Sequence, residues 1–472
     1  MNICVVGTGY VGLVAGTGLA DFGMNVTCVD NDPEKIEILN NGGVPIYEIG
    51  LAELIQRNVR QNRLHFTTDL ASAVEKSLVI YVAVGTPSRP DGSVNLEYFD
   101  KVGVEIGKAM KDYKVIAIKS TVPVGSAKRL RQIVEENQSE PVEFDIVSNP
   151  EFLREGAAVQ DFTHPDRVIL GSDSKRALAI MKDIYRPLYL LETPIITTNN
   201  ETAEMIKYAS NTMLALRISF INEIANLCDE VGADVYDVAR AVGMDKRIGP
   251  KFLHPGPGFG GSCLPKDVKA LNALANENSY EFKLTRAVID ANERQKNLIV
   301  EKAEKFFGTL AGKKVALLGM AFKQNTDDIR EAPSLSVIRD LKRAGAVINV
   351  FDPIALDSAK REVDGVNFCE DAFSACRDAH LAIVITEWNE FRNLNLSKLK
   401  NVMAQANIFD TRDIYNPERL REMGFSYLTI GRGSYRHIAP SFNDITFALP
   451  ERIKRRINFE VTDISNHVGA NN

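Results

Sequence analysis

Short apolar runs alternate with amphipathic stretches along the first part of the chain. Runs rich in β-branched residues at 3–6, 26–29, 78–84, 115–118 and 144–147 predict buried strands. The stretches between them are long enough for helices, and this alternation is typical of βαβ units around a parallel sheet. We therefore expect an N-terminal domain of this type over residues 1–198.

The pattern becomes purely helical near residue 200. Residues 201–231 contain no proline or glycine, and apolar side chains recur at helical spacing, which predicts one long buried helix. Further helices are expected at 235–242, 266–276 and 283–307, giving an all-helical central domain over 199–311. Because one chain offers few partners for so many apolar positions, we expect a homodimer through these helices. The alternative is that the flanking domains cover them.

Strand-like runs return at 315–318, 347–351 and 381–386. A weak internal repeat accompanies them, in which the spacing of Leu19, Gly23 and Asp30 recurs at Leu341, Gly345 and Asp352. This predicts a second nucleotide-binding fold over 312–437. The predicted fold class is thus α/β, with two Rossmann-like parallel sheets joined by helices. Residues 438–472 show no clear period and are expected to form a loosely ordered tail.

The composition is that of a soluble globular protein. The chain has 472 residues, is 45% hydrophobic and 25% charged, and has a net charge of −6, which disfavours nucleic-acid binding. No apolar run reaches the roughly 18 residues of a membrane span, and the N-terminus does not resemble a signal peptide. The six cysteines form neither a disulfide framework nor a metal-ligand pattern, so we expect free thiols, no metal and a cytoplasmic location.

A glycine-rich loop follows the first predicted strand. Gly7, Gly9 and Gly12 form G-x-G-x-x-G at the start of a helix, where such glycines permit a tight turn, a close pyrophosphate and close packing. Asp30 ends the next strand, where a carboxylate accepts hydrogen bonds from ribose hydroxyls and repels a 2′-phosphate. The motif therefore predicts NAD rather than NADP. Thr86 lies where such folds place a loop along the dinucleotide, whereas Lys35 is more typical of a solvated lysine.

The corresponding loop of the third domain differs. Residues 319–323 contain one glycine and the bulky Phe322, so this loop is not expected to bind a dinucleotide in the same way. Lys323 and Arg330 place two cations at the mouth of the fold, which suggests a diphosphate partner. The alternative is that both are ordinary surface charges.

The strongest chemical signal is the segment 258–267, which reads GFGGSCLPKD. Its glycines lead into a helix that begins near Pro265, so Cys263 is expected at a helix N-terminus, where the helix dipole favours the thiolate. Lys266 and Asp267 share its helical face. We therefore interpret Cys263 as a nucleophile, with a structural thiol as the alternative.

Two polar residues interrupt the apolar face of the long central helix. Lys207 and Asn211 are four residues apart and share one side of that helix. A lysine on such a face needs a partner or a function. It could pair with Asp267, donate to a developing oxyanion, or do both.

Together these motifs resemble the UDP-glucose/GDP-mannose dehydrogenase family, and most closely its UDP-glucose branch. The resemblance covers residues 1 to about 432. It rests on these segments: GTGYVGL at 7–13, NPEFLREG at 149–156, Lys207 with Asn211, GFGGSCLPKD at 258–267, GMAFK at 319–323 and DIRE at 328–331.

The resemblance implies a four-electron oxidation of a primary alcohol to a carboxylate, with two NAD reduced. Cys263 would add to the intermediate aldehyde, and the resulting thiohemiacetal would be oxidised to a thioester that water hydrolyses. By similarity, Lys207 stabilises the negative oxygen, Asp267 assists with water or proton transfer, Glu151 serves as a base and Thr121 orients water. Asn211 belongs to the same catalytic group.

The resemblance also implies two sets of binding residues. Those for NAD are Gly7, Gly9, Tyr10, Val11, Gly12, Asp30, Lys35, Thr86, Thr121, Glu155, Lys266 and Arg330. Those for the UDP-sugar are Glu151, Phe152, Leu153, Arg154, Glu155, Lys207, Asn211, Phe252, Leu253, His254, Pro255, Gly256, Gly260 and Lys323, with Arg247 reaching the sugar of the neighbouring subunit.

Three alternatives remain at this point. A GDP-mannose 6-dehydrogenase would use identical chemistry, although Arg247 and the 254–261 loop fit the UDP-glucose branch better. A β-hydroxyacid dehydrogenase also uses K-x-x-x-N but needs neither Cys263 nor a third domain. A non-catalytic NAD sensor would be expected to lack Lys207, Cys263 or Asp267, all of which are present. Related enzymes for N-acetylated sugars carry histidine before the nucleophile, where this chain has Ser262.

Overall fold

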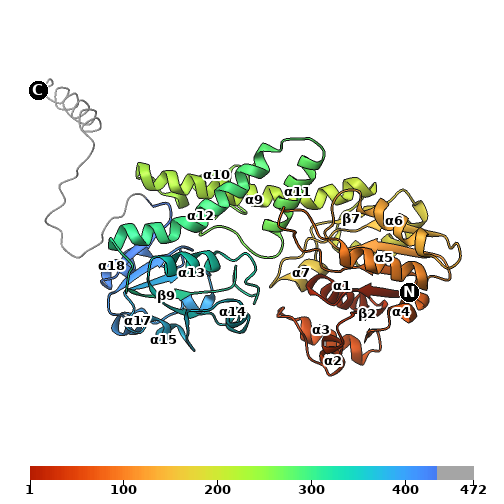
Figure 1. The fold of residues 1–472 in the computed structure, drawn as a ribbon, viewed down its shortest axis with the longest axis horizontal. Helices are drawn as coiled ribbons and strands as arrows, with labels where there is room; N and C mark the ends of the chain where they lie inside the picture. The colour runs from red at the N-terminus through yellow and green to blue at the C-terminus, as the bar shows by residue number, and fades with distance from the viewer. Residues whose placement is uncertain (433–472) are drawn as a thin grey trace, which may run out of the picture.

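The computed structural model describes residues 1–432, in which two sheets are joined by long helices (Figure 1). The tail expected at 438–472 lies outside the described residues. The first sheet has the strand order β3-β2-β1-β4-β5-β6-β7-β8 and is parallel except where β6 meets β7. Its strands are β1 (Asn2–Val6), β2 (Asn25–Val29), β3 (Leu64–Thr67), β4 (Val79–Val82), β5 (Lys114–Ile118), β6 (Phe144–Ser148), β7 (Val168–Gly171) and β8 (Ile195–Thr198).

Helices cover both faces of this sheet. They are α1 (Tyr10–Asp21), α2 (Pro33–Asn40), α3 (Leu51–Arg60), α4 (Leu70–Lys76), α5 (Glu97–Ala109), α6 (Ser126–Asn137), α7 (Ala158–Thr163), α8 (Lys175–Ile184) and the 3₁₀ helix η1 (Arg186–Leu191). Every residue of β4 and β5 is buried, as expected for parallel strands between two helical layers. The five predicted strands are confirmed within one or two residues. The expectation missed β3, β7 and β8.

The helical region consists of α9 (Asn200–Val231), α10 (Val235–Met244), α11 (Leu264–Glu277) and α12 (Lys283–Phe307). The side chain of Asn199 caps the start of α9, and Gly232 ends it with φ +79°. Its 32 residues span about 48 Å at 1.5 Å per residue. The first half packs on β6 and β7, whereas Ala225 and Cys228 join the core of the second sheet. One helix thus packs against both sheets.

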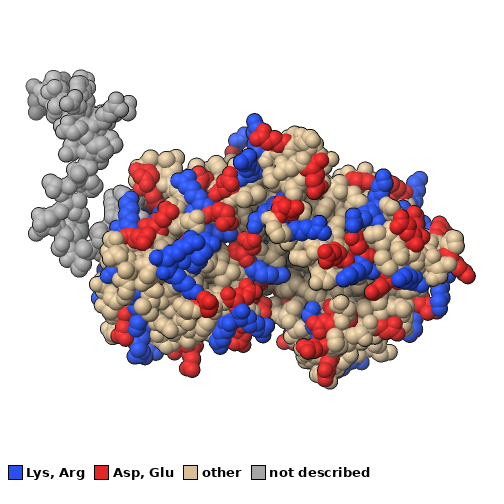
Figure 2. All heavy atoms as spheres, viewed as in Figure 1, with Lys and Arg blue, Asp and Glu red and all other residues tan. Residues whose placement is uncertain are grey.

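The flanking sheets bury only part of α9. Met213, Phe220, Leu227 and Val231 are 51–67% exposed, so the helix is less buried than the sequence pattern predicts. In the described part of the chain, no helix is both long and apolar enough to cross a membrane. On the face drawn in Figure 2, basic and acidic side chains are interspersed.

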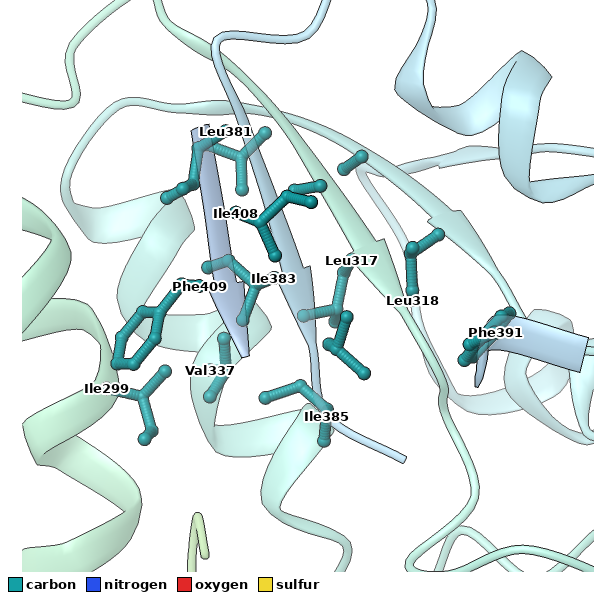
Figure 3. Packing of buried hydrophobic residues seen from close by; sticks show 14 of the residues in the cluster. Ile299, Leu317, Leu318, Val337, Leu381, Ile383, Ile385, Phe391, Ile408 and Phe409 are labelled. Atoms are coloured by element: carbon teal, nitrogen blue, oxygen red, sulfur yellow. The ribbon is translucent and has the colours of Figure 1, made fainter. Parts of the chain in front are cut away.

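The second sheet is entirely parallel, in the order β11-β10-β9-β12-β13-β14. Its strands are β9 (Lys314–Leu318), β10 (Val347–Phe351), β11 (Asn367–Phe368), β12 (Leu381–Val384), β13 (Asn407–Asp410) and β14 (Ser426–Thr429). Its helices are α13 (Pro333–Arg343), α14 (Leu356–Glu362), α15 (Ala372–Cys376), α16 (Asn389–Arg392), α17 (Leu396–Val402) and α18 (Pro417–Glu422). Figure 3 shows Ile299 of α12 among the strand side chains of this core.

Candidate active site

The glycine-rich loop before α11 is held from several sides. Both the N–H and the C=O of Phe259 bond to the amide of Asn292 on α12, at 2.8 and 3.0 Å. The N–H of Gly261 donates to the carbonyl of Arg330 at 2.8 Å. A Cβ on Gly260 would lie 2.4 Å from the carbonyl of Glu331, so this close approach requires glycine. These contacts fix the position of the loop and therefore of the first residues of α11.

Cys263 is the N-cap residue of α11, as the sequence predicts. Burial is the main reason that the pKa of its thiol is raised to about 11, and the charge of Glu151 adds to it while Lys207 opposes it. The pKa of this thiol is thus raised, not lowered as its place at a helix N-terminus led us to expect, because burial is the largest contribution. The thiol must lose its proton before it can act.

Lys207 forms a buried ion pair with Glu151, with 2.7 Å between Nζ and Oε1. Burial opposes the charge, but Glu151 and Asp267 outweigh it and raise the pKa of Lys207 above its ordinary value. Burial likewise opposes ionisation of Glu151, yet Lys207 lowers the pKa of this carboxyl. Lys207 thus remains a cation beside the sulfur, which suits it to stabilise a developing negative oxygen.

Asp267 is fully buried and is held by two nitrogen donors. Asn211 Nδ2 donates to Oδ2 at 2.6 Å, and Lys266 Nζ donates to Oδ1 at 2.7 Å. The suggested pairing of Lys207 with Asp267 is therefore wrong, because Asn211 and Lys266 occupy both oxygens and Glu151 takes the lysine. The structure nevertheless brings Lys207, Asn211 and Asp267 together around Cys263.

Glu155 connects this cluster to the second sheet. Its Oε1 accepts from the hydroxyl of Ser262 at 2.9 Å, and its Oε2 accepts from that of Thr326 at 3.1 Å. Arg330 approaches to 3.6 Å while it pairs with Asp328 at 2.7 Å. Burial, and then the charge of Asp328, raise the pKa of Glu155 to about 7. Segments from both sheets and the central helices therefore meet at this carboxyl group.

The first glycine loop fits a dinucleotide. A Cβ on Gly7 or Gly12 would lie 2.6 or 1.9 Å from a backbone oxygen, so these two glycines close the strand–helix turn. Around Gly9 there is open space within 4 Å, which leaves room for a pyrophosphate at the start of α1. Asp30 Oδ2 accepts from the N–H and the hydroxyl of Thr8, both at 2.7 Å. Burial opposes ionisation of Asp30, but these bonds lower its pKa below the ordinary value.

Other residues expected to contact NAD lie along the same sheet edge. The hydroxyl of Thr86 donates to the carbonyl of Thr121 at 2.8 Å, which joins the loops after β4 and β5. The hydroxyl of Tyr10 accepts from the N–H of Gly156 at 2.8 Å. Val11 is half-buried on α1, and Lys35 on α2 lies 3.8 Å from Asp32 with its side chain 42% exposed.

The 151–155 segment divides between the interior and solvent. The N–H of Leu153 donates to Glu151 Oε2 at 2.6 Å, and the ring of Phe152 lies 5.5 Å from Lys207 Nζ. Arg154 instead pairs with Asp161 at 2.6 Å, and its side chain is 62% exposed. The structure therefore places Phe152 and Leu153 at the cluster and turns Arg154 away from it.

The remaining residues expected at the sugar nucleotide lie on loops. The N–H of Gly256 donates to Asn222 at 2.8 Å, and Phe252 has φ +64°, an unusual backbone for a bulky residue. Leu253 and Pro255 are buried, His254 is exposed, and Arg247 is 89% exposed beside Asp245. Burial lowers the pKa of Lys323, whose Nζ lies 5.4 Å from the centre of the Phe322 ring. A lysine removed from water in this way favours an anionic partner.

Two residues of the cluster were missed by the sequence reasoning. Ser262 was considered only as a branch marker, yet its Oγ lies 3.5 Å from Cys263 Sγ. A hydroxyl next to a candidate nucleophile was the available signal. Thr326 had no comparable signal, since its contact with Glu155 depends on how the second sheet docks.

Three family models cover most of the chain. The NAD binding domain of the UDP-glucose/GDP-mannose dehydrogenase family matches residues 1–189, its central domain matches 201–294, and its UDP binding domain matches 316–417. The chain belongs to the UDP-glucose/GDP-mannose dehydrogenase family. This dehydrogenase is therefore an oxidoreductase that uses NAD, and its two sheets correspond to the NAD-binding and UDP-binding domains of the family.

Its relatives include well-matched full-length proteins. UDP-glucose 6-dehydrogenase TuaD of Bacillus subtilis (strain 168) is 46% identical over 441 residues, which is 93% of this chain and 95% of that protein. UDP-glucose 6-dehydrogenase of Rhizobium meliloti (strain 1021) is 44% identical over 92% of this chain and 100% of its own. The solved structure of a UDP-glucose dehydrogenase from Pyrobaculum islandicum has a TM-score of 0.85 at 35% identity, covering 92% of this chain and 98% of that one.

Proposed function

We propose that this dehydrogenase oxidises C6 of UDP-glucose from alcohol to carboxylate, forms UDP-glucuronate and reduces two NAD per sugar. The observation that carries the proposal is Cys263 at the head of α11, with Lys207 and Asp267 beside it. A single oxidation of an alcohol needs no sulfur, whereas oxidation of an aldehyde is aided by a covalent thiol adduct. The names of the relatives support glucose and UDP as the substrate parts.

When bound, NAD supplies the acceptor of a hydride in each of the two oxidations. In the first, Glu151 accepts the proton of the C6 hydroxyl and passes it to solvent, Lys207 stabilises the C6 oxygen, and departure of the hydride from C6 leaves an aldehyde. Cys263 Sγ then bonds to C6, and the carbonyl electron pair moves to the oxygen beside Lys207. Loss of the second hydride from C6 leaves a thioester on Cys263.

Hydrolysis of the thioester completes the reaction. Water adds to C6, the C–S bond breaks, and the sulfur leaves with its bonding electrons. Glu151 takes a proton from the water, with Thr121 positioning that water, while Asn211 and Lys266 hold the Asp267 carboxylate in place. Lys207, as an ammonium group, stabilises the negative oxygen in this step as well.

The binding residues are divided between the two sheets. Gly9 and Asp30 would hold the pyrophosphate and ribose of NAD, together with the rest of the expected set. Lys323 would pair with the diphosphate of the UDP-sugar, and Gly260 would belong to the same binding site. The exposed apolar side chains of α9 fit a second copy of the chain, and the exposed Arg247 could then reach the neighbouring sugar.

NADH absorbance with a panel of sugar nucleotides tests the proposal. We expect two NADH per UDP-glucose, and no turnover in Cys263→Ala. Cys369→Ala is the matched control, because Cys369 is also a partly exposed free thiol but lies on the far edge of the second sheet. One NADH per substrate, or full activity of Cys263→Ala, would refute the thioester route. Faster turnover of GDP-mannose would instead assign the chain to the other branch of the family.

A further inference from the structure

We propose that Ser262 and Glu155 form a proton relay that removes the proton of the Cys263 thiol. The inference rests on the proposed function, since it concerns the same sulfur. Neither residue has been given this role by the motifs, which assign Glu155 only to ligand binding. The resting thiol is protonated, so the enzyme needs a base within reach of it.

The hydrogen-bond geometry gives the relay a direction. Ser262 Oγ lies 2.9 Å from Glu155 Oε1 and 3.5 Å from Cys263 Sγ. A serine hydroxyl carries one hydrogen, and a carboxylate can only accept, so that hydrogen points to Glu155. The thiol hydrogen is then free to point to Ser262 Oγ. The thiol therefore donates a hydrogen bond to Ser262, and Ser262 donates one to Glu155.

The other carboxylates near the sulfur are already engaged. Glu151 is paired with Lys207 at 2.7 Å, and Asp267 accepts from Asn211 and from Lys266. Both carboxylates face the sulfur, but within residues 1–432 the side chain at hydrogen-bond distance from Cys263 Sγ is Ser262, which leads to Glu155. Glu155 accepts hydrogen bonds from the neutral hydroxyls of Ser262 and Thr326. Its cationic neighbour Arg330 lies farther away at 3.6 Å and is paired more closely with Asp328.

The surroundings of Glu155 also suit it to act as a base. The charged groups that face it are Asp328, Arg330 and Lys323, all from the segment between β9 and α13. Burial and Asp328 raise the pKa of Glu155 to about 7, close to neutral pH. A base is most effective when its pKa lies near that pH.

Each bond that breaks in this proton transfer is matched by a bond that forms. The S–H bond of Cys263 breaks as an O–H bond forms on Ser262, and the original hydroxyl hydrogen of Ser262 moves to Glu155 Oε1. The electron pair left on sulfur forms the C–S bond with the aldehyde, and the carbonyl oxygen becomes negative beside Lys207. Glu155 then returns its proton to water.

Alkylation of Cys263 by iodoacetamide in the full chain, followed by mass spectrometry from pH 6 to 10.5, tests the relay without substrate. At pH 7 we expect Ser262→Ala and Glu155→Gln to react about 100-fold more slowly, a typical effect of losing a positioned base. The deficit should shrink as the pH approaches 11, where hydroxide removes the proton directly. Ser262→Thr should restore the rate lost in Ser262→Ala, because it returns a hydroxyl. Alkylation of Cys369 in each variant is the internal control.

A deficit that is equal at every pH would mean that Ser262 only shapes the loop, and would overturn the relay. An unchanged rate would overturn it too. These outcomes are separable from failure of the proposed function. If Cys263→Ala still yields two NADH per sugar, the thioester route fails whatever the alkylation shows. If that variant is inactive while Ser262→Ala alkylates normally, only the relay fails.

Discussion

The two sheets of this dehydrogenase share the same turn after their first strand, but the segment that follows the turn differs between them. After the first strand of each, a glycine with positive φ turns the chain, +99° at Gly7 and +103° at Gly319, and its N–H bonds to the neighbouring strand at 2.7 and 2.8 Å. In each, an aspartate just beyond that strand accepts N–H groups from the loop, and these are Asp30 and Asp352. The internal sequence repeat therefore marks the same structural positions in both domains.

The two domains differ in the segment after this turn. In the first sheet α1 begins at Tyr10, so the helix N-terminus faces the space beside Gly9. In the second, α13 begins only at Pro333, and residues 322–332 extend instead to Glu155, through Thr326, and to the glycine-rich loop at Gly261, through the carbonyl of Arg330. One loop leaves open space at Gly9, whereas the other packs against the candidate active site. The two domains therefore share a fold but differ in role, because the segment between the first strand and the next helix is longer in the second domain.

The largest expected effect comes from removing the second aspartate. Asp352→Ala should lower the free energy of unfolding by about 4 kcal/mol, because it leaves several buried N–H donors without an acceptor. Asp352 is fully buried, and its donors are the backbone of Met320, Ala321, Ile354 and Ala355 and the indole of Trp388. Urea denaturation measures the change.

The matched variant Asp30→Ala should destabilise the protein much less, because Asp30 is 9% exposed and lies beside the open dinucleotide site. Equal losses of stability in Asp30→Ala and Asp352→Ala would contradict the predicted difference between the two domains.

The second prediction concerns coenzyme binding. Asp30→Ala should raise the dissociation constant of NAD by roughly 10- to 150-fold, since hydrogen bonds to a charged acceptor contribute about 1.5–3 kcal/mol. Titration of NAD by protein fluorescence measures it. Asp352→Asn, which keeps the shape of its side chain, should leave NAD affinity within about twofold if it folds. A large effect of Asp352→Asn on NAD would show that the second sheet also contributes to the dinucleotide site.

Sequence reasoning reached the elements that depend on local pattern. Eight of the fourteen strands in residues 1–432, the four central helices and the glycine loops around Gly9 and Cys263 are visible because periodicity and turn chemistry are local, whereas β3, β7, β8, β11, β13 and β14 were missed. It failed where a property depends on packing. The partner of Lys207 is Glu151, 56 residues away, and the docking of α9 on β6 brings them together. The raised pKa of Cys263 comes from burial, which no motif displays.

The smallest predicted effect is a pH dependence of stability that arises at one end of α9 and not at the other. Near its second end Ala225 and Cys228 pack in an apolar core, whereas near its first end Glu204 accepts from the N–H groups of Gly125 and Ala127 at 2.7 and 2.9 Å. Burial raises the pKa of Glu204 from 4.5 to about 7. Between these values the folded chain binds more protons than the unfolded chain, so stability should fall as the pH rises from about 5 to 7 and then level off.

Glu204→Gln should reduce this fall by about 1–2 kcal/mol, as expected for one group with this shift. The variant also loses one acceptor oxygen, which lowers stability by about 1 kcal/mol at every pH and is distinguished by its lack of slope. Urea denaturation at pH 5, 6, 7 and 8 separates the two contributions. Glu155 also has a raised pKa and should leave a residual slope in the variant. If the unfolding free energy of Glu204→Gln changes with pH as much as that of the wild type, the contact of Glu204 with the first sheet does not depend on pH. The predicted difference between the two ends of α9 would then be wrong.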